Sequence, residues 1–193
     1  GVSRDGRWLS ISASEGTAPR NDLWVADLSS SEPTEPILVP VQTGIDAQTG
    51  LRFGRDGRVY VFTDRDAPRG RLAVTSPGAW DPADWTDLIA EDPDAVLEGF
   101  AILDGPELDR AVMLVSWTRH AISEVTVHDL ASGEQIGIVE LPGVGTVGGM
   151  SELPDGGHEA WFIYTDNATI PRVMHYDARD GALTVSDYPP GFV

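Results

Sequence analysis

The sequence repeats itself about every fifty residues, and this period limits the folds that the chain can adopt. An Asp-Gly pair opens an alternating apolar run at Asp5, Asp56 and Asp155. The first two aspartates lie 51 positions apart, and the third lies 99 positions further on, close to two more periods. Self-similarity at this period predicts a propeller or a solenoid, in which each unit buries a face only against its neighbours.

A second landmark follows the same period. Alternating runs that end in aspartate occur at Leu23–Asp27, Val125–Asp129 and Met174–Asp177, and their terminal aspartates are 102 and then 48 positions apart. The remaining unit carries Arg71–Thr75 at this place, without the aspartate. Two landmarks with one spacing indicate four copies of a single structural unit.

Each unit has the pattern of four short strands. In the second unit, residues 49–53 lead into a turn at Gly54–Gly57, and residues 58–63 leave it. An Asp-Gly pair between alternating runs is a strong hairpin signal, because glycine tolerates the positive φ that the turn requires. A third strand is expected near 72–76, and a tryptophan-bearing fourth strand near 84–90. The predicted fold is therefore an all-β propeller whose blades have four antiparallel strands.

The units do not divide the chain evenly. An incomplete first blade is expected over residues 1–43, without its innermost strand, and complete blades are expected at about 45–91, 95–141 and 144–188. We interpret residues 1–193 as a fragment of a larger propeller. The alternative is a small four-bladed ring that its last strand closes. An open edge on the first blade predicts self-association, since unpaired strand edges invite strand addition.

Composition excludes several classes of function. The formal net charge is −18, with thirteen arginines and no lysine, and such a surface repels nucleic acid. This charge suggests either an acidic funnel for cationic ligands or a compositional bias toward Arg. The chain has no cysteine for disulfides or zinc-thiolate sites, and no apolar stretch long enough for a membrane span. We expect a soluble protein, cytoplasmic or periplasmic, with no membrane partner.

Motifs for chemistry within the chain are weak. The nearest string to a Gly-x-Ser-x-Gly nucleophile turn is Gly149–Leu153, which lacks the second glycine. The four histidines have no metal-ligand spacing, so neither a metal nor another cofactor is predicted. The six tryptophans are interpreted as packing between blades, with a carbohydrate site as the alternative.

One loop of the first unit is more specific. The segment Ser14–Leu28, preceded by Asp5–Trp8, closely resembles the propeller of the prolyl oligopeptidase family. The resemblance resumes in order at Asp64–Leu72, Val127–Glu134 and Pro171–Asp177, so it covers essentially the whole chain. Oligopeptidase B, a relative that prefers basic residues, shares this arrangement.

The resemblance implies a seven-bladed propeller that covers an α/β-hydrolase domain in the same parent chain. Such enzymes are serine peptidases that cleave short peptides after proline, and their propeller restricts substrate access. Their Ser-His-Asp triad lies in the hydrolase domain, so this chain should supply no catalytic residue and be inactive alone. By position, Ser14, Glu15, Gly16 and Thr17 match the loop that walls the substrate cavity, with Thr17 closest to the substrate.

Three Pro-Arg pairs recur at corresponding loops, at Arg20, Arg69 and Arg172. Their guanidinium groups are candidates for docking acidic groups of the hydrolase domain, because arginine binds carboxylates through two parallel hydrogen bonds. The alternative is that they only solubilise loops. Two functions therefore remain open: a non-catalytic gating part of a prolyl peptidase, or a free-standing propeller that binds a protein or glycan partner.

Overall fold

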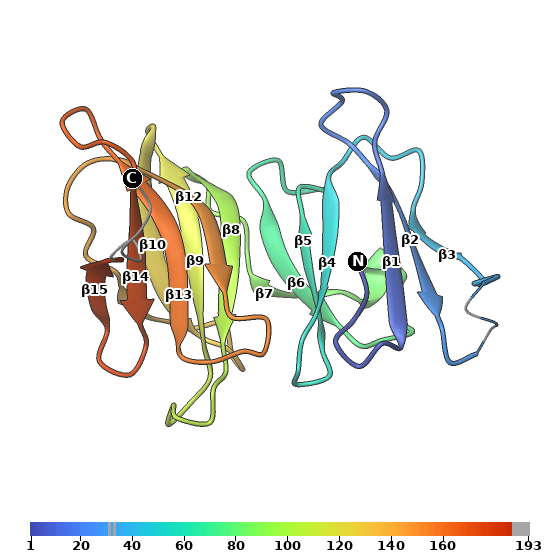
Figure 1. The fold of residues 1–193 in the computed structure, drawn as a ribbon. Helices are drawn as coiled ribbons and strands as arrows, with labels where there is room; N and C mark the ends of the chain where they lie inside the picture. Colours follow the sequence, from blue (N-terminus) through green and yellow to red (C-terminus); the bar gives the residue numbers. More distant parts are fainter. Residues whose placement is uncertain (31, 33, 187–193) are drawn as a thin grey trace. The chain divides into compact units, whose positions relative to one another are not determined.

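We describe the chain from a computed structural model that covers residues 1–30, 32 and 34–186. The end of the last predicted blade, at residues 187–188, lies outside this range. The chain divides into two compact units, Gly1–Asp92 and Pro93–Val193, and each is described by itself. Figure 1 shows that strands dominate the described chain, with a single 3₁₀ turn in the first unit.

The first unit contains two antiparallel sheets, one of three strands in the order β1-β2-β3 and one of four in the order β4-β5-β6-β7. The strands are β1 (Trp8–Ala13), β2 (Asp22–Asp27), β3 (Val39–Gln42), β4 (Thr49–Phe53), β5 (Val59–Thr63), β6 (Arg71–Thr75) and β7 (Thr86–Ile89). The 3₁₀ turn η1 (Pro82–Asp84) precedes β7, and the Asp81 carboxylate caps it by accepting the N–H of Ala83.

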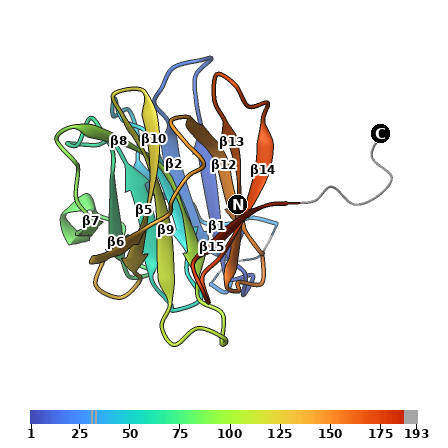
Figure 2. The same cartoon turned by 90° about the vertical axis from the view of Figure 1, so that its left-hand side faces the viewer.

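The second unit contains two four-stranded antiparallel sheets, in the orders β8-β9-β10-β11 and β12-β13-β14-β15. Their strands are β8 (Ala95–Leu103), β9 (Val112–Arg119), β10 (Ile122–Asp129), β11 (Gln135–Ile138), β12 (Thr146–Glu152), β13 (Glu159–Thr165), β14 (Arg172–Asp177) and β15 (Ala182–Val185). Figure 2 shows β12, β13 and β14 side by side from a second direction. In every sheet, strands that follow one another in sequence also pair, which is the meander of a propeller blade. The predicted all-β, partial-propeller fold is confirmed.

The repeated Asp-Gly turns have a common local cause. Asp5 and Asp56 each accept, through Oδ1, the backbone N–H of the residue two positions further on, at 3.1 and 3.0 Å. Gly6 and Gly57 follow with φ angles of 72° and 82°, which a side chain would strain. The hydrogen bond from the Ser3 hydroxyl, followed by that from the Arg7 N–H, lowers the pKa of Asp5.

The terminal aspartates of the second landmark also cap turns. Asp27 accepts the N–H and hydroxyl of Ser29 at 2.9 and 2.5 Å, and its carboxylate also binds the Arg7 guanidinium. Those bonds, the one from Arg7 above all, hold the pKa of Asp27 well below its ordinary value. Asp177 pairs with Arg179, which lowers its pKa to about 2. The period in the sequence therefore marks where a carboxylate is needed to end a strand.

The edge of the first sheet is less open than expected. Residues Gly1–Ser3 run back along β1, with a bridge between Val2 and Leu9. Gly1 and Ser10 exchange two backbone hydrogen bonds of 2.8 Å, counting the terminal amine as a donor. The Asp5-Gly6 turn is a hairpin, so the residues before it must lie beside the strand after it. Self-association through this edge stays a prediction.

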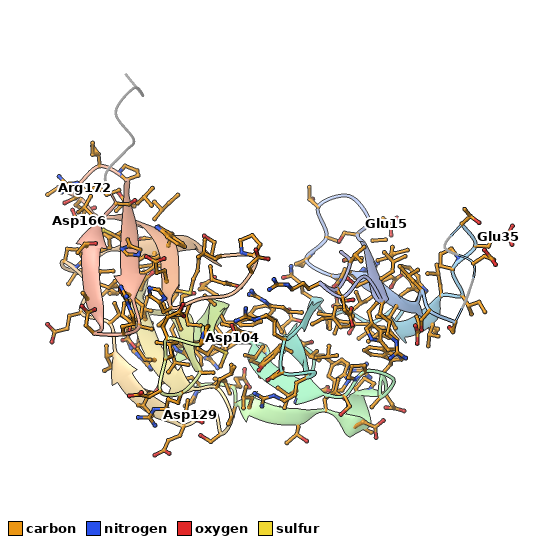
Figure 3. The ribbon with its side chains drawn as sticks, turned by 60° about the horizontal axis from the view of Figure 1, so that its bottom comes forward. Glu15, Glu35, Asp104, Asp129, Asp166 and Arg172 are labelled. Carbon is orange, nitrogen blue, oxygen red and sulfur yellow. The ribbon has the colours of Figure 1, made fainter. Side chains whose placement is uncertain are left out.

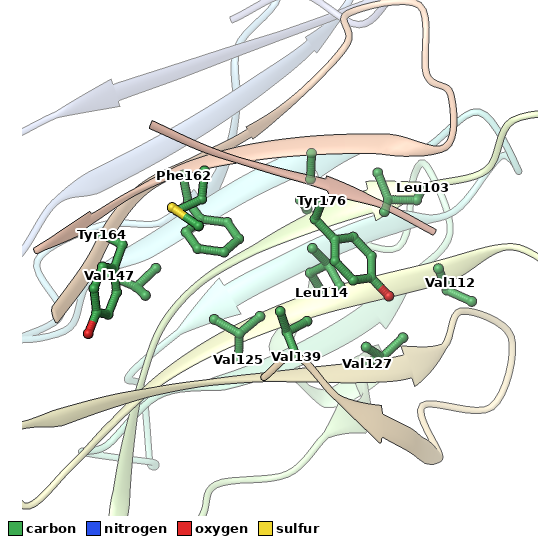
Figure 4. Close-up of a cluster of buried hydrophobic side chains, with 13 residues drawn as sticks. Leu103, Val112, Leu114, Val125, Val127, Val139, Val147, Phe162, Tyr164 and Tyr176 are labelled. Carbon is green, nitrogen blue, oxygen red and sulfur yellow. The ribbon is translucent and has the colours of Figure 1, made fainter. Parts of the chain in front are cut away.

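The core of the second unit lies between its two sheets, as Figure 4 shows. Leu114 and Val125 come from one sheet, and Phe162, Tyr164 and Tyr176 from the other; all are at most 4% exposed. Alternation along β13 explains this arrangement, because Phe162 and Tyr164 point to the core while Ile163 between them is 46% exposed. Each sheet therefore buries one face against its neighbour.

The first unit uses tryptophan for the same purpose. Trp8 stacks on Phe53 of the next sheet, with ring centroids 6.3 Å apart, and meets Trp80 edge-on at 5.3 Å. Trp80 and Trp85 belong to the segment between β6 and β7, and both are buried in this core. The structure thus agrees with the packing role predicted for these tryptophans, and Trp85 lies just before β7 instead of within it.

We predict that Phe162→Ala lowers the free energy of unfolding of the second unit by about 3–5 kcal/mol, because it removes a buried ring and leaves a cavity. Urea denaturation followed by circular dichroism measures the loss. The matched control is Ile163→Ala on the exposed face of the same strand, which should cost less than half as much. Equal losses for the two variants would contradict the assignment of the core face.

Candidate functional site

The predicted substrate loop joins β1 to β2 and extends beyond the ends of both strands (Figure 1). Ser14, Glu15, Gly16 and Thr17 are all exposed. A turn forms where the Ala18 N–H donates to the Glu15 carbonyl at 3.2 Å, and Gly16 inside it has a φ of 60°. Glycine at this place lets the chain reverse without strain.

Charge on the loop is concentrated at its tip. The Glu15 side chain is 93% exposed (Figure 3), and its Oε2 lies 3.8 Å from an Nη of Arg20. An exposed pair at this distance contributes little to stability, because water screens it. The loop thus presents a carboxylate and a guanidinium to solvent.

The loop is fastened at its base by Asn21, which is 6% exposed. Its side-chain Nδ2 donates to the Ser12 hydroxyl and to the Thr49 carbonyl, both at 2.9 Å, and its Oδ1 accepts the Thr49 N–H at 2.8 Å. The Asn21 backbone N–H also donates to the Ala47 carbonyl at 3.2 Å. One carboxamide therefore pairs with both backbone groups of Thr49, as a neighbouring strand residue would.

A chain of buried hydrogen bonds continues from this contact. Gln42 Nε2 donates to the backbone carbonyls of Asn21 and Ala47, at 3.0 and 2.9 Å, so its Oε1 must be an acceptor. The Thr49 hydroxyl donates to this oxygen at 3.0 Å. That hydroxyl is then free only to accept, so the Thr63 hydroxyl, 2.7 Å away, is the donor to it. The orientations of the Thr49 and Thr63 hydroxyl groups are thus both determined by their hydrogen-bond partners.

A groove of about 390 Å³ lies beside the loop. Its walls carry hydroxyl and carboxamide groups from Ser10, Ser12, Ser14, Asn21 and Gln48, and Leu23, Leu51 and Phe62 add apolar surface. Among its lining side chains none is ionisable. Hydroxyl and carboxamide groups both donate and accept hydrogen bonds, so this lining suits the uncharged amides of a peptide backbone.

The other two candidate arginines lie at corresponding places in their sheets. Arg69 is in the loop between β5 and β6, where its backbone N–H donates to Glu91 Oε1 at 2.7 Å. Arg172 begins β14 after the β13–β14 loop, as Figure 3 shows. Both side chains are exposed. Arg69 shares the first unit with Arg20, whereas Arg172 belongs to the second.

The two weak sequence motifs, the Gly149–Leu153 string and the histidines, do not form a catalytic or metal-binding arrangement among the described residues. Ser151 lies within strand β12, not on a strand-to-helix turn, and its hydroxyl approaches the Trp161 carbonyl at 3.5 Å. Across residues 1–30, 32 and 34–186, no three His, Asp or Glu side chains gather as metal ligands would. The same range contains no helix with the length and apolarity that a bilayer crossing requires.

Comparison with known proteins identifies the family of this chain. The family model of the prolyl oligopeptidase N-terminal β-propeller domain matches residues 1–188. The chain belongs to this family. The prolyl endopeptidases of Elizabethkingia miricola and Elizabethkingia meningoseptica are 26% and 27% identical to it in alignments of 192 positions that cover 97% of this chain. These residues make up 24% of each relative, so this propeller spans about a quarter of their length.

Solved structures resemble this propeller as well. A structure from a mechanistic study of two prolyl endopeptidases has a TM-score of 0.79 and 26% identity, over 96% of this chain and 25% of that one. Prolyl oligopeptidase B from Galerina marginata, bound to a 35-residue hydrolysis and macrocyclization substrate, also has a TM-score of 0.79, at 18% identity. The match covers 95% of this chain and 25% of the Galerina marginata chain. At 18% identity, it shows that the two chains share a fold.

The buried polar residues at the base of the loop were not predicted as part of the site. Gln42 and Thr49 are polar positions at the ends of short strands, where an exposed side chain is the ordinary expectation. A signal was present in Asn21, which directly precedes an alternating strand and is suited to bond with backbone groups. Its partner Thr49 is 28 positions away, and the sequence contains no marker of that pairing.

We predict that Thr49→Val lowers the free energy of unfolding of the first unit by about 1–3 kcal/mol. Valine has nearly the same shape but leaves Gln42 Oε1 without the Thr49 donor and the Thr63 hydroxyl hydrogen without its acceptor. Urea denaturation measures the change. Thr86→Val is the control, because Thr86 is exposed on β7 and its replacement should be close to neutral. A neutral Thr49→Val would show that water satisfies these groups.

Proposed function

We propose that this chain is the non-catalytic propeller part of a prolyl-oligopeptidase-like serine endopeptidase, which limits access to short peptides. The match of the family domain to residues 1–188 carries this proposal. Two relatives of similar sequence are named prolyl endopeptidases, and the chain corresponds to about a quarter of each. The remaining length of such a protein has room for an α/β-hydrolase domain with the Ser-His-Asp triad. The parent enzyme would then cleave after proline.

Within this function, the loop of Ser14, Glu15, Gly16 and Thr17 walls the substrate cavity. Its exposure, its buried attachment at Asn21 and the groove beside it, with its hydroxyl and carboxamide lining, support the role. A rigid scaffold with exposed loops at one end is a common way to present binding residues. The groove would hold the peptide backbone, while the hydrolase domain supplies the chemistry.

The alternative function is a free-standing propeller that binds a protein or glycan partner. It draws on the same exposed loop, since rim loops of propellers serve many unrelated functions. Three of the six tryptophans, Trp80, Trp85 and Trp117, give it no support, because they are buried and cannot stack on a sugar. The peptidase part is therefore the better interpretation.

The proposed function is tested with the full-length product of the gene that encodes this chain. Sequence downstream of Val193 should encode a hydrolase domain with Gly-x-Ser-x-Gly. That product should hydrolyse a Gly-Pro p-nitroanilide peptide, and a serine-directed phosphonylating reagent should stop the reaction. The 193-residue chain, as the control, should release no nitroaniline because the triad lies elsewhere. A stop codon directly after Val193 would favour the binding module instead.

We also propose that Arg20, Arg69 and Arg172 dock the hydrolase domain by pairing with its carboxylates. In the full-length product, Arg20→Glu, Arg69→Glu and Arg172→Glu should each lower kcat/KM for the peptide several-fold, because charge reversal weakens domain closure. The loss should shrink at high salt. Arg110→Glu is the control: its side chain is 62% exposed in the β8–β9 loop, at the other end of the sheets. An equal effect of Arg110→Glu would contradict a specific docking role.

A further inference from the structure

The first and second units share a hydrogen-bond pattern that ties one sheet to the next. In the first unit, the Asn21 N–H donates to the Ala47 carbonyl, and the Asn21 side chain accepts the Thr49 N–H. In the second unit, the Ser123 N–H donates to the Gly145 carbonyl at 2.9 Å, and the Ser123 hydroxyl accepts the Val147 N–H at 2.9 Å. Both residues stand two positions before the buried strand residues Leu23 and Val125.

The shared part of this pattern needs only a short side chain with one acceptor. Serine supplies it at position 123, where the β9–β10 connection is a tight turn at His120 and Ala121. Asparagine at position 21 adds two donors that serine lacks. They are used for the Ser12 hydroxyl and the Thr49 carbonyl, both at 2.9 Å.

The two added bonds lie at the base of the candidate loop. Ser12 is the second-last residue of β1, and Asn21 directly precedes β2, so the two residues lie where the loop leaves one strand and enters the other. The bond between them closes the loop, and the bond to Thr49 attaches the closed base to the next sheet. Positions 21 and 123 correspond to each other. Position 21 follows the longer loop, and it also has the asparagine whose side chain supplies the extra donors.

We propose that Asn21 is a positioning residue that sets the place of the Ser14–Thr17 loop relative to β4, beyond its share in joining the two sheets. Its carboxamide touches no substrate in this role and acts through the loop. The effect on peptide binding rests on the proposed function, whereas the effect on the loop does not. Fixing a binding loop before the ligand arrives strengthens binding, because less conformational entropy is lost on association.

Asn21→Ser separates the two tasks. A serine at position 21 keeps the acceptor that Ser123 uses for the sheet-to-sheet bond, but it cannot reach both Ser12 and the Thr49 carbonyl. Ser12→Ala is the second variant: Ser12 is exposed, so the change removes one loop bond at little risk to folding. Ser123→Ala is the control, because it removes the sheet-to-sheet bond where no candidate loop is present.

Hydrogen exchange on the full-length product, without substrate, is the first readout. Asn21→Ser should raise the exchange rate of the Ala18 amide and its loop neighbours at least tenfold, and Ser12→Ala should raise it by a smaller factor. Ser123→Ala should leave that rate unchanged, although it lowers the midpoint of urea denaturation of the second unit. Unchanged loop exchange in Asn21→Ser, or an equal rise in Ser123→Ala, would overturn the proposal.

Peptide kinetics are the second readout. If the product is a prolyl peptidase, Asn21→Ser should raise KM for the Gly-Pro p-nitroanilide peptide several-fold with kcat nearly unchanged, since the loop binds but does not react. A fall in kcat alone would contradict a role through the loop. A product that cleaves no prolyl peptide would refute the proposed function, while the exchange rates would still decide the role of Asn21.

Discussion

Each sheet of this chain has a face that it can bury only against the next sheet, and the rest of the structure depends on that packing. Phe162, Tyr164 and Tyr176 cover the facing residues Leu114 and Val125, and Trp8 stacks on Phe53 in the same manner. A single four-stranded sheet would leave these rings in water. Pairs of sheets are therefore the smallest compact units, and the chain divides into two of them.

Apolar packing alone does not determine how far one sheet is shifted along the next. Hydrogen bonds are directional, and Asn21 and Ser123 use them to connect specific residues of neighbouring sheets. A shift of one residue would leave the Thr49 or Val147 N–H buried without a partner, which costs on the order of 1–3 kcal/mol. The polar contacts at this end of the sheets thus specify the register, and packing supplies most of the stability.

The same arrangement explains how the Ser14–Thr17 loop can be both exposed and well placed. Ser14–Thr17 make few contacts of their own, while Asn21 at the base is connected to Gln42, Thr49 and Thr63 in a fully oriented chain. The loop is therefore exposed at its tip and held at its base.

The sequence by itself determined the all-β blades, their period and their turns, because those features depend on neighbouring residues. Asp5 accepts an N–H two positions away, and Gly6 supplies the positive φ beside it. Both roles can therefore be predicted from the sequence. It also indicated the family and the exposed loop at Ser14–Thr17. Only the tertiary structure decided the contact of Trp80 with Trp8 and the pairing of Asn21 with Thr49. These contacts join residues 28 or more positions apart, or depend on which face a neighbouring sheet covers, and neither is encoded by local spacing.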